Sequence, residues 1–346
     1  MFEGHAPKEL ARAMTAHTRP LVLRFKVGGP GDYNLELTLK PSFVSSLYAS
    51  TDGSSWSKQA GLYAGLVVVR QVDEVVEAYV ASEVDEGASE ALVHELGLWD
   101  ERPSYRISKL RGALKEQIRA LTELFPGVRL SIAPHDFNCI FIAVALSKRT
   151  RYEVFVRKWV KELWDRWHCD PTTIASLKLE ELERVGTSYQ LVDLVKTLRD
   201  YMKLGVDVRR TAVEDLRRAL MSCWGVGPKV ADATLLFTTR SPWIVPCDTH
   251  LQRVSRRLGW VEEEVRMPSK ALCLSLYCDE CVNKFGPCLK VETEEKFRGF
   301  GGWVQTLTYL FGSAICTSSS PKCSRCHDVL RDYCMEGARR ARGWPS

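Results

Sequence analysis

Two hydrophobic patterns divide the chain. Near the start, apolar and polar side chains alternate, as in RPLVLRFKV (19–27) and YNLELTLKPSF (33–43). Alternation over such short runs predicts half-buried β-strands. The stretch GLVVVRQVDEVVEAYVAS (65–82) predicts two more strands around a turn at Val72-Asp73-Glu74, and the acidic, small-residue stretch SEVDEGASE (82–90) predicts a loop.

From about residue 108 the apolar residues recur every three or four positions, as helices require. LRGALKEQIRALTELFPG (110–127) predicts a helix that Pro126-Gly127 ends. The segment 136–164 predicts a buried helix, a polar break at Ser147–Thr150 and an amphipathic helix. Three further helices are predicted over 213–224, 229–239 and 248–260.

These patterns predict an α+β fold. We expect an antiparallel, β-rich domain over 1–105, a mainly helical domain of two subdomains over 106–310, and a cysteine-rich loop with a basic tail over 311–346. The 346 residues suffice for several domains, and 45% hydrophobic and 26% charged residues are ordinary for a soluble protein.

Composition also bounds location and partners. CIFIAVAL (139–146) is too short to span a bilayer, and MFEGHAPKEL at the start has no apolar signal-peptide core. We therefore expect an intracellular protein, cytoplasmic or nucleoid-associated, that is a monomer without a membrane partner. The net charge of +5 permits a polyanionic partner without requiring one.

A glycine-rich turn separates two of the predicted helices. Leu216, Leu220 and Trp224 fall on one helical face, and Gly225-Val226-Gly227 then interrupts the helix. Pro228 suits the first position of a new helix, which puts Lys229 in its first turn. Such a helix-hairpin-helix points backbone N–H groups at a phosphate, and bare glycines let a DNA strand approach.

Two other interpretations of this turn are a dinucleotide-binding loop and a plain connector. A dinucleotide loop needs a preceding strand and a third glycine, and the sequence offers neither. A connector remains open on the turn alone.

The wider sequence around the turn is more specific. Over 216–260, WGVGPKVAD followed by VPCDTH resembles the signature of the helix-hairpin-helix DNA glycosylases with a Gly/Pro…Asp loop, especially the 8-oxoguanine branch. The resemblance is looser over 108–180 and 291–334. It implies that Lys229 is the nucleophile, that Asp248 assists it, and that His250 contacts a DNA phosphate.

That chemistry is reasonable for these residue types. Breaking an N-glycosidic bond develops positive charge at the sugar, which a carboxylate such as Asp248 stabilises. A neutral lysine amine can attack C1′ and form a Schiff base, and burial at a helix N-terminus would lower its pKa. The alternatives are that Lys229 contacts phosphate and that Asp248 only caps a helix, where Thr249 and Gln252 fit a capping box.

The resemblance also implies further DNA contacts. Tyr189 in GTSYQ matches a tyrosine that wedges near the lesion, although it could equally be a packing residue. Lys148 and Arg149 lie where relatives carry an Asn- or Gln-rich tip, and a solvated helix end is the alternative. Ala233 replaces the cysteine that the 8-oxoguanine branch often stacks on the base, which leaves the lesion open.

Eight of the twelve cysteines lie between Cys273 and Cys334, which indicates metal binding rather than disulfides. The last four suit zinc or an iron–sulfur cluster. Their spacing resembles the [4Fe-4S] motif C-x6-C-x2-C-x5-C of the endonuclease III type, with a last gap two residues longer. The candidate ligands are Cys316, Cys323, Cys326 and Cys334, with Lys322 and Arg325 as phosphate contacts on the intervening loop.

A second set within an insertion at 273–288 suits zinc, another cluster or ordinary thiols: Cys273, Cys278, Cys281 and Cys288. The remaining cysteines are expected to be buried thiols: Cys139, Cys169, Cys223 and Cys247.

We therefore expect a base-excision DNA glycosylase with AP lyase activity. Its partner would be double-stranded DNA containing a damaged base, first of all an oxidised purine such as 8-oxoguanine. One alternative is a monofunctional glycosylase in which Asp248 activates water against alkylated, deaminated or mispaired bases. The other is a helix-hairpin-helix protein that binds DNA without catalysis.

Overall fold

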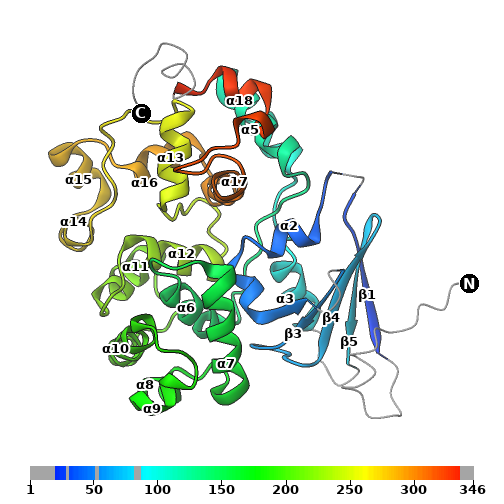
Figure 1. Cartoon of the computed structure of the whole chain (residues 1–346), viewed down its shortest axis with the longest axis vertical. Helices are drawn as coiled ribbons and strands as arrows, with labels where there is room; N and C mark the ends of the chain where they lie inside the picture. The colour runs from blue at the N-terminus through cyan, green and yellow to red at the C-terminus, as the bar shows by residue number, and fades with distance from the viewer. Residues whose placement is uncertain (1–19, 29–30, 51–53, 82–86, 336–346) are drawn as a thin grey trace, which may run out of the picture. The chain divides into compact units, whose positions relative to one another are not determined.

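The computed structural model describes residues 20–28, 31–50, 54–81 and 87–335 (Figure 1). Predictions about the chain start and the basic tail lie outside these residues. The chain forms two compact units that interleave in sequence. The first, the sheet unit, comprises 1–100, 131–205 and 237–239; the second, the hairpin unit, comprises 101–130, 206–236 and 240–346. The predicted boundaries at 105 and 310 stay predictions.

The sheet unit contains an antiparallel five-stranded sheet in the order β1-β5-β4-β3-β2. Three of its strands were predicted, and β4 and β5 meet in a two-residue turn in which Asp73 takes a φ of +50°. Residues of β4 and β5 are buried, so this hairpin forms the centre of the sheet. The strands are β1 (Leu21–Lys26), β2 (Tyr48–Ser50), β3 (Ser55–Lys58), β4 (Val67–Val72) and β5 (Val75–Val80).

The strand predicted over 33–43 is wrong. Asn34 caps a short helix, because its side chain accepts from the Leu37 N–H at 2.9 Å, and Ser42 caps a 3-10 turn in the same way. These local caps outweigh the alternating pattern. The predicted loop over 82–90 is also wrong where the structure describes it, since residues 87–90 begin a helix.

The other elements of the sheet unit are helical and include the two that were predicted over 136–164. They are α2 (Leu35–Leu39), η1 (Phe43–Leu47), α3 (Gly87–Glu95), α6 (Phe137–Leu146), η2 (Tyr152–Val156), α7 (Arg157–Trp167), α8 (Pro171–Ser176), α9 (Leu179–Glu183) and α10 (Tyr189–Lys203).

A buried ion-pair cluster joins the sheet to the helices of this unit, and a disulfide joins two of the helical segments to each other. Lys58 on β3 is 1% exposed, and its Nζ lies 2.5 Å from Oε1 of Glu95 and 3.1 Å from Oδ2 of Asp136. The buried ammonium group of Lys58 needs both carboxylates, because removing a partner would leave a buried charge uncompensated. Cys139 and Cys169, expected as thiols, instead form a disulfide between α6 and the end of α7.

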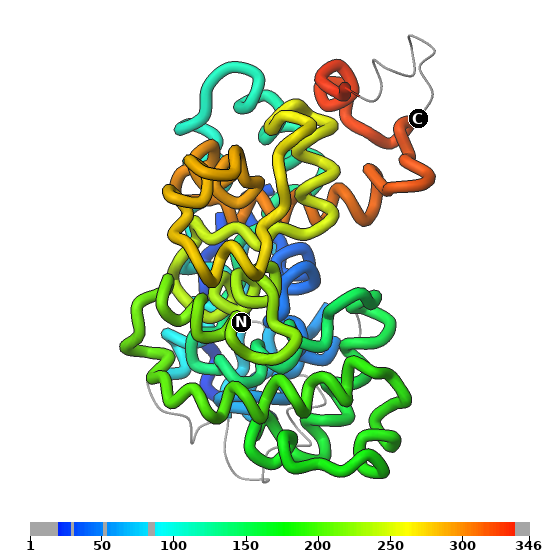
Figure 2. The backbone as a smooth tube through the Cα atoms, turned by 90° about the vertical axis from the view of Figure 1, so that its left-hand side faces the viewer, coloured from blue at the N-terminus to red at the C-terminus, as the bar shows by residue number. Residues whose placement is uncertain are grey.

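The hairpin unit is helical, as predicted for the later part of the chain (Figures 1 and 2). Its helix α17 packs against α13, α5 and α16, and Trp303 on α17 is fully buried. Among the described helices, none is long and apolar enough to cross a membrane. The elements are α4 (Pro103–Ser108), α5 (Gly112–Leu124), α11 (Val213–Ser222), α12 (Pro228–Thr238), α13 (Thr249–Arg257), α14 (Lys270–Ser275), α15 (Cys278–Phe285), α16 (Leu289–Lys296), α17 (Gly301–Ala314), η3 (Cys323–Arg325) and α18 (Asp328–Asp332).

Candidate active site

A tight turn joins α11 to α12, where the sequence predicts the hairpin. Gly225 takes a φ of +66°, a left-handed conformation that a side chain would strain. Val226 is buried, and its N–H donates to the Cys223 carbonyl at 3.3 Å. Trp224 lies beyond the end of α11 and is 53% exposed, so the prediction that it shares a helical face with Leu216 and Leu220 is wrong.

Gly227 has a different role from Gly225. Its φ is ordinary, and a Cβ atom built on it would meet nothing within 4 Å. Packing within the chain therefore does not require glycine here. An open backbone directly before a helix N-terminus is what a close-lying phosphate needs.

Lys229 lies in the first turn of α12, as predicted from Pro228. The side chain is half-buried. Burial lowers the pKa of Lys229, and the nearby Asp248 carboxylate opposes this only in part. A lysine of lowered pKa holds more of its amine in the neutral, nucleophilic form at neutral pH.

Asp248 caps α13 and faces a second donor. Its Oδ1 accepts from the Leu251 N–H at 2.7 Å, and its Oδ2 accepts from Nε2 of Gln305 at 3.1 Å. The capping box predicted for Thr249 and Gln252 is wrong, because Asp248 is the capping residue and Thr249 is the first residue of the helix. Two donors on two helices therefore fix the direction of this carboxylate.

Gln305 was missed by the sequence analysis. It is buried, at 7% exposure, in α17. It lies in the largely apolar segment VQTLTYLFGSAIC (304–316). The sequence did contain a signal for Gln305, namely an amide side chain among apolar residues. A buried amide needs a hydrogen-bond partner, so such a residue is a candidate for a polar contact.

His250 follows Asp248 by two residues. Its ring packs edge-on against Tyr309, with centroids 5.2 Å apart, and its Nδ1 lies 3.1 Å from Nη2 of Arg253. Burial lowers the pKa of His250 below its ordinary value. A backbone contact with Gly312 and the Asp248 carboxylate favour the protonated ring and offset this only in part.

Three of the predicted DNA contacts lie in the sheet unit: Lys148, Arg149 and Tyr189. Tyr189 begins α10 and is 56% exposed, and the next residue, Gln190, donates from Nε2 to the Lys148 carbonyl at 3.1 Å. Arg149 is exposed and takes a φ of +52°. That conformation costs a side chain about 1–2 kcal/mol, so Arg149 sits where glycine or asparagine would be more stable.

The four C-terminal cysteines line one cavity of about 130 Å³. Nη1 of Arg257 donates to Sγ of Cys316 at 3.1 Å. Burial and the three neighbouring sulfurs raise the pKa of Cys326 to about 11. Lys322 and Arg325 are exposed on the loop between the cysteines. The donor set and the shared cavity fit a metal centre bound by thiolates.

The second predicted set also converges. Cys273, Cys278, Cys281 and Cys288 all line a separate cavity of about 330 Å³ in the hairpin unit. Of the other cysteines, Cys223 and Cys247 are buried thiols, as predicted.

Known proteins with a similar sequence or a similar fold can be compared with this chain. No protein-family model matches the chain. It is 27% identical over 237 residues to endonuclease III of Thermotoga maritima, covering 66% of this chain and 96% of that protein. It is 26% identical over 165 residues to the N-glycosylase/DNA lyase of Saccharomyces cerevisiae, covering 41% and 43%. The apo-form of the 8-oxoguanine glycosylase/lyase of Clostridium acetobutylicum has a similar fold, with a TM-score of 0.62 at 15% identity over 83% of this chain and 95% of that one.

Proposed function

This chain belongs to the helix-hairpin-helix superfamily of DNA glycosylases, and we propose that it excises a damaged base from double-stranded DNA and then cuts the strand. The observation that carries the proposal is the pair formed by Lys229 and Asp248. Burial lowers the pKa of the lysine, and the carboxylate is held by donors from two helices.

In the first step the neutral amine of Lys229 attacks C1′ of the damaged nucleotide. The C1′–N bond breaks, its electron pair leaves with the base, and the base takes up a proton. The sugar passes through a cationic state, which the Asp248 carboxylate stabilises. A lysine nucleophile in the neutral form makes this covalent route available without activation of water.

In the second step the sugar ring opens and the nitrogen of Lys229 loses its protons to give a Schiff base with C1′. Protonated, this iminium draws electrons from C2′, which makes its proton acidic. Loss of that proton breaks the C3′–O bond, and the phosphate leaves with the electron pair. Water then hydrolyses the Schiff base and returns the lysine to its starting form.

Several groups would hold the DNA. We assign the phosphate contacts of the hairpin to the backbone of Gly225, Val226 and Gly227, with the His250 ring as a further contact. Lys322 and Arg325 supply positive charge on the cysteine loop. In the sheet unit, the exposed side chains of Arg149 and Tyr189 and the half-buried side chain of Lys148 would contact the duplex.

We also propose a [4Fe-4S] cluster on Cys316, Cys323, Cys326 and Cys334. The four thiols share one cavity, and its volume of about 130 Å³ exceeds what one bare ion would need. The cluster would hold the C-terminal loop together and so present Lys322 and Arg325. No step of the base excision passes through it.

An oxidised purine, with 8-oxoguanine first, is the lesion that we propose. The proposal follows the resemblance of WGVGPKVAD and VPCDTH to the 8-oxoguanine branch. Ala233, buried in α12, departs from that branch, which often has a cysteine there. We further propose that the protein acts as a monomer inside the cell.

The test is a set of duplexes that each carry one lesion: an oxidised purine, an oxidised pyrimidine, uracil or an alkylated purine. We expect base release with strand cleavage on the oxidised purine, and loss of both in Asp248→Asn. Base release without strand cleavage would favour the monofunctional alternative. Binding to every duplex without base release would favour a non-catalytic DNA-binding protein.

A further inference from the structure

The second group of four cysteines is assembled from three helices. Cys273 lies on α14, Cys278 and Cys281 lie on α15, and Cys288 caps the N-terminus of α16. All are thiols that line the cavity of about 330 Å³. Cys281 and Cys288 are 6% and 7% exposed, respectively. Four thiols converging on one cavity form a donor set for a metal centre, which packing alone does not call for.

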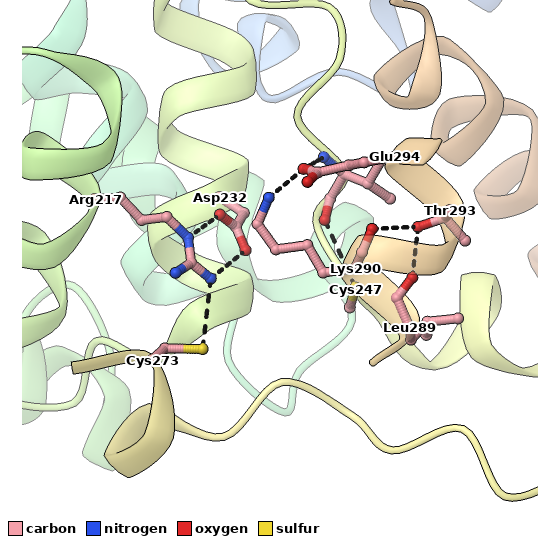
Figure 3. Close-up of polar contacts among 9 residues, drawn as sticks. Arg217, Asp232, Cys247, Cys273, Leu289, Lys290, Thr293 and Glu294 are labelled. Carbon is pink, nitrogen blue, oxygen red and sulfur yellow. Dashed lines mark hydrogen bonds and ion pairs between the residues drawn. The ribbon is translucent and has the colours of Figure 1, made fainter. Parts of the chain in front are cut away.

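Arginine side chains contact two of these sulfurs. Nη2 of Arg266 donates to Sγ of Cys281 at 3.0 Å. Figure 3 shows the other contact, in which Nη2 of Arg217 lies 3.9 Å from Sγ of Cys273. The C-terminal set has the same feature in the contact from Arg257 to Cys316. In a metal centre, arginine side chains at this distance would donate hydrogen bonds to the coordinated sulfurs, and both sets provide them.

The side chain of Arg266 gives a further indication that a ligand binds in this cavity. Its backbone is fixed, because its carbonyl accepts from the Leu289 N–H at 2.9 Å and its N–H donates to the Pro287 carbonyl at 3.2 Å. Its side chain lines the cavity, and within the described residues its buried Nε has no hydrogen-bond partner. A buried donor without an acceptor is costly. An inorganic sulfide in the cavity would supply that acceptor.

We propose that Cys273, Cys278, Cys281 and Cys288 hold a second iron–sulfur cluster, of the [4Fe-4S] type. The cavity has room for a body of four irons and four sulfides. Four thiolates are the usual ligands of such a cluster. Zinc bound by the same four thiolates is the alternative that the test below separates.

The cluster would fasten its segment to the hairpin. Arg217 on α11 forms two hydrogen bonds to Asp232 on α12, at 2.5 Å and 3.0 Å, and also reaches Cys273 (Figure 3). At the start of α14, Nζ of Lys270 donates to the Cys223 carbonyl at 3.0 Å. The segment therefore contacts α11, and Arg217 links it to α12 through Asp232. The proposal does not depend on the chemistry of Lys229.

The test is the metal content of the full chain after reconstitution with ferrous iron and sulfide in the absence of oxygen. We expect about eight irons and eight sulfides per chain, two clusters of four. Cys278→Ser/Cys281→Ser should lower both to about four, and the matched Cys323→Ser/Cys326→Ser should do the same through the other set. Circular dichroism of each variant reports whether it is folded.

Two results would overturn the proposal. One is a wild-type chain that holds about four irons, with this number unchanged in Cys278→Ser/Cys281→Ser. The other is one zinc ion per chain that this variant loses while its iron stays. The wild-type iron and zinc contents decide the question even if a variant fails to fold.

Discussion

Nε2 of Gln305 lies 3.1 Å from Oδ2 of Asp248, the carboxylate oxygen that does not cap α13. The carboxylate is thus oriented by two helices, α13 through its own cap and α17 through Gln305. A group that stabilises a developing charge acts best when it is already fixed in direction. Gln305 is therefore a positioning residue for Asp248 in the proposed reaction.

Gln305→Leu should slow base excision. A hydrogen bond to a charged group contributes about 1.5–3 kcal/mol, which corresponds to about a ten- to hundredfold loss of single-turnover rate if it orients the reacting group. DNA affinity should stay the same. Gln117→Leu is the matched control, because Gln117 is an equally buried amide that bonds to Leu258 and Trp260. Equal rates in the two variants would remove Gln305 from the mechanism.

The excision rate should rise with pH. Because burial lowers the pKa of Lys229, the fraction of neutral amine grows as the pH rises and levels off below the ordinary pKa of lysine. Single-turnover rates over a pH series measure this midpoint. A rate that keeps rising up to the ordinary lysine value would show that the amine is not activated, and a flat profile would exclude it as the group that must lose a proton.

The two hairpin glycines should respond differently to alanine. Gly225→Ala places a side chain at a φ of +66° and should lower the free energy of unfolding by about 1–2 kcal/mol. Gly227→Ala meets open space and should leave stability nearly unchanged. Both should weaken binding to duplex DNA, as measured by fluorescence anisotropy. Unimpaired binding by Gly227→Ala would mean that phosphate does not approach there.

Arg149→Gly should separate stability from function. It relieves a left-handed backbone and should raise the free energy of unfolding by about 1 kcal/mol, while weakening excision from duplex DNA. The matched control is His168→Gly, since His168 has a φ of +55° at the end of α7. The control should gain stability and keep its activity. Full activity in Arg149→Gly would assign Arg149 to a solvated helix end.

Sequence patterns predicted the elements whose signal is local. The hairpin of β4 and β5, the helices around Gly225 and the position of Lys229 all follow from periodicity and from the backbone preferences of glycine and proline. The segment 33–43 shows the limit of this reasoning. Its alternation suits a strand, but Asn34 and Ser42 offer caps that favour helical turns.

Long-range pairings could not be predicted in this way. Lys58 meets Glu95 and Asp136, and Cys139 meets Cys169, only after the chain has folded. The contact between Gln305 and Asp248 is of the same kind, because 57 residues separate the two. Resemblance to a family led to Lys229 and Asp248, whereas the residue that positions Asp248 required coordinates.

The most direct test of the central claim is borohydride trapping on a lesion that the protein cleaves. Reduction of a Schiff base should join the wild-type chain covalently to the DNA, and peptide mapping should place the link on Lys229. Lys229→Ala should give no adduct while still binding the duplex. A wild-type chain that cleaves the lesion but never forms an adduct, or an adduct that persists in Lys229→Ala, would contradict the account.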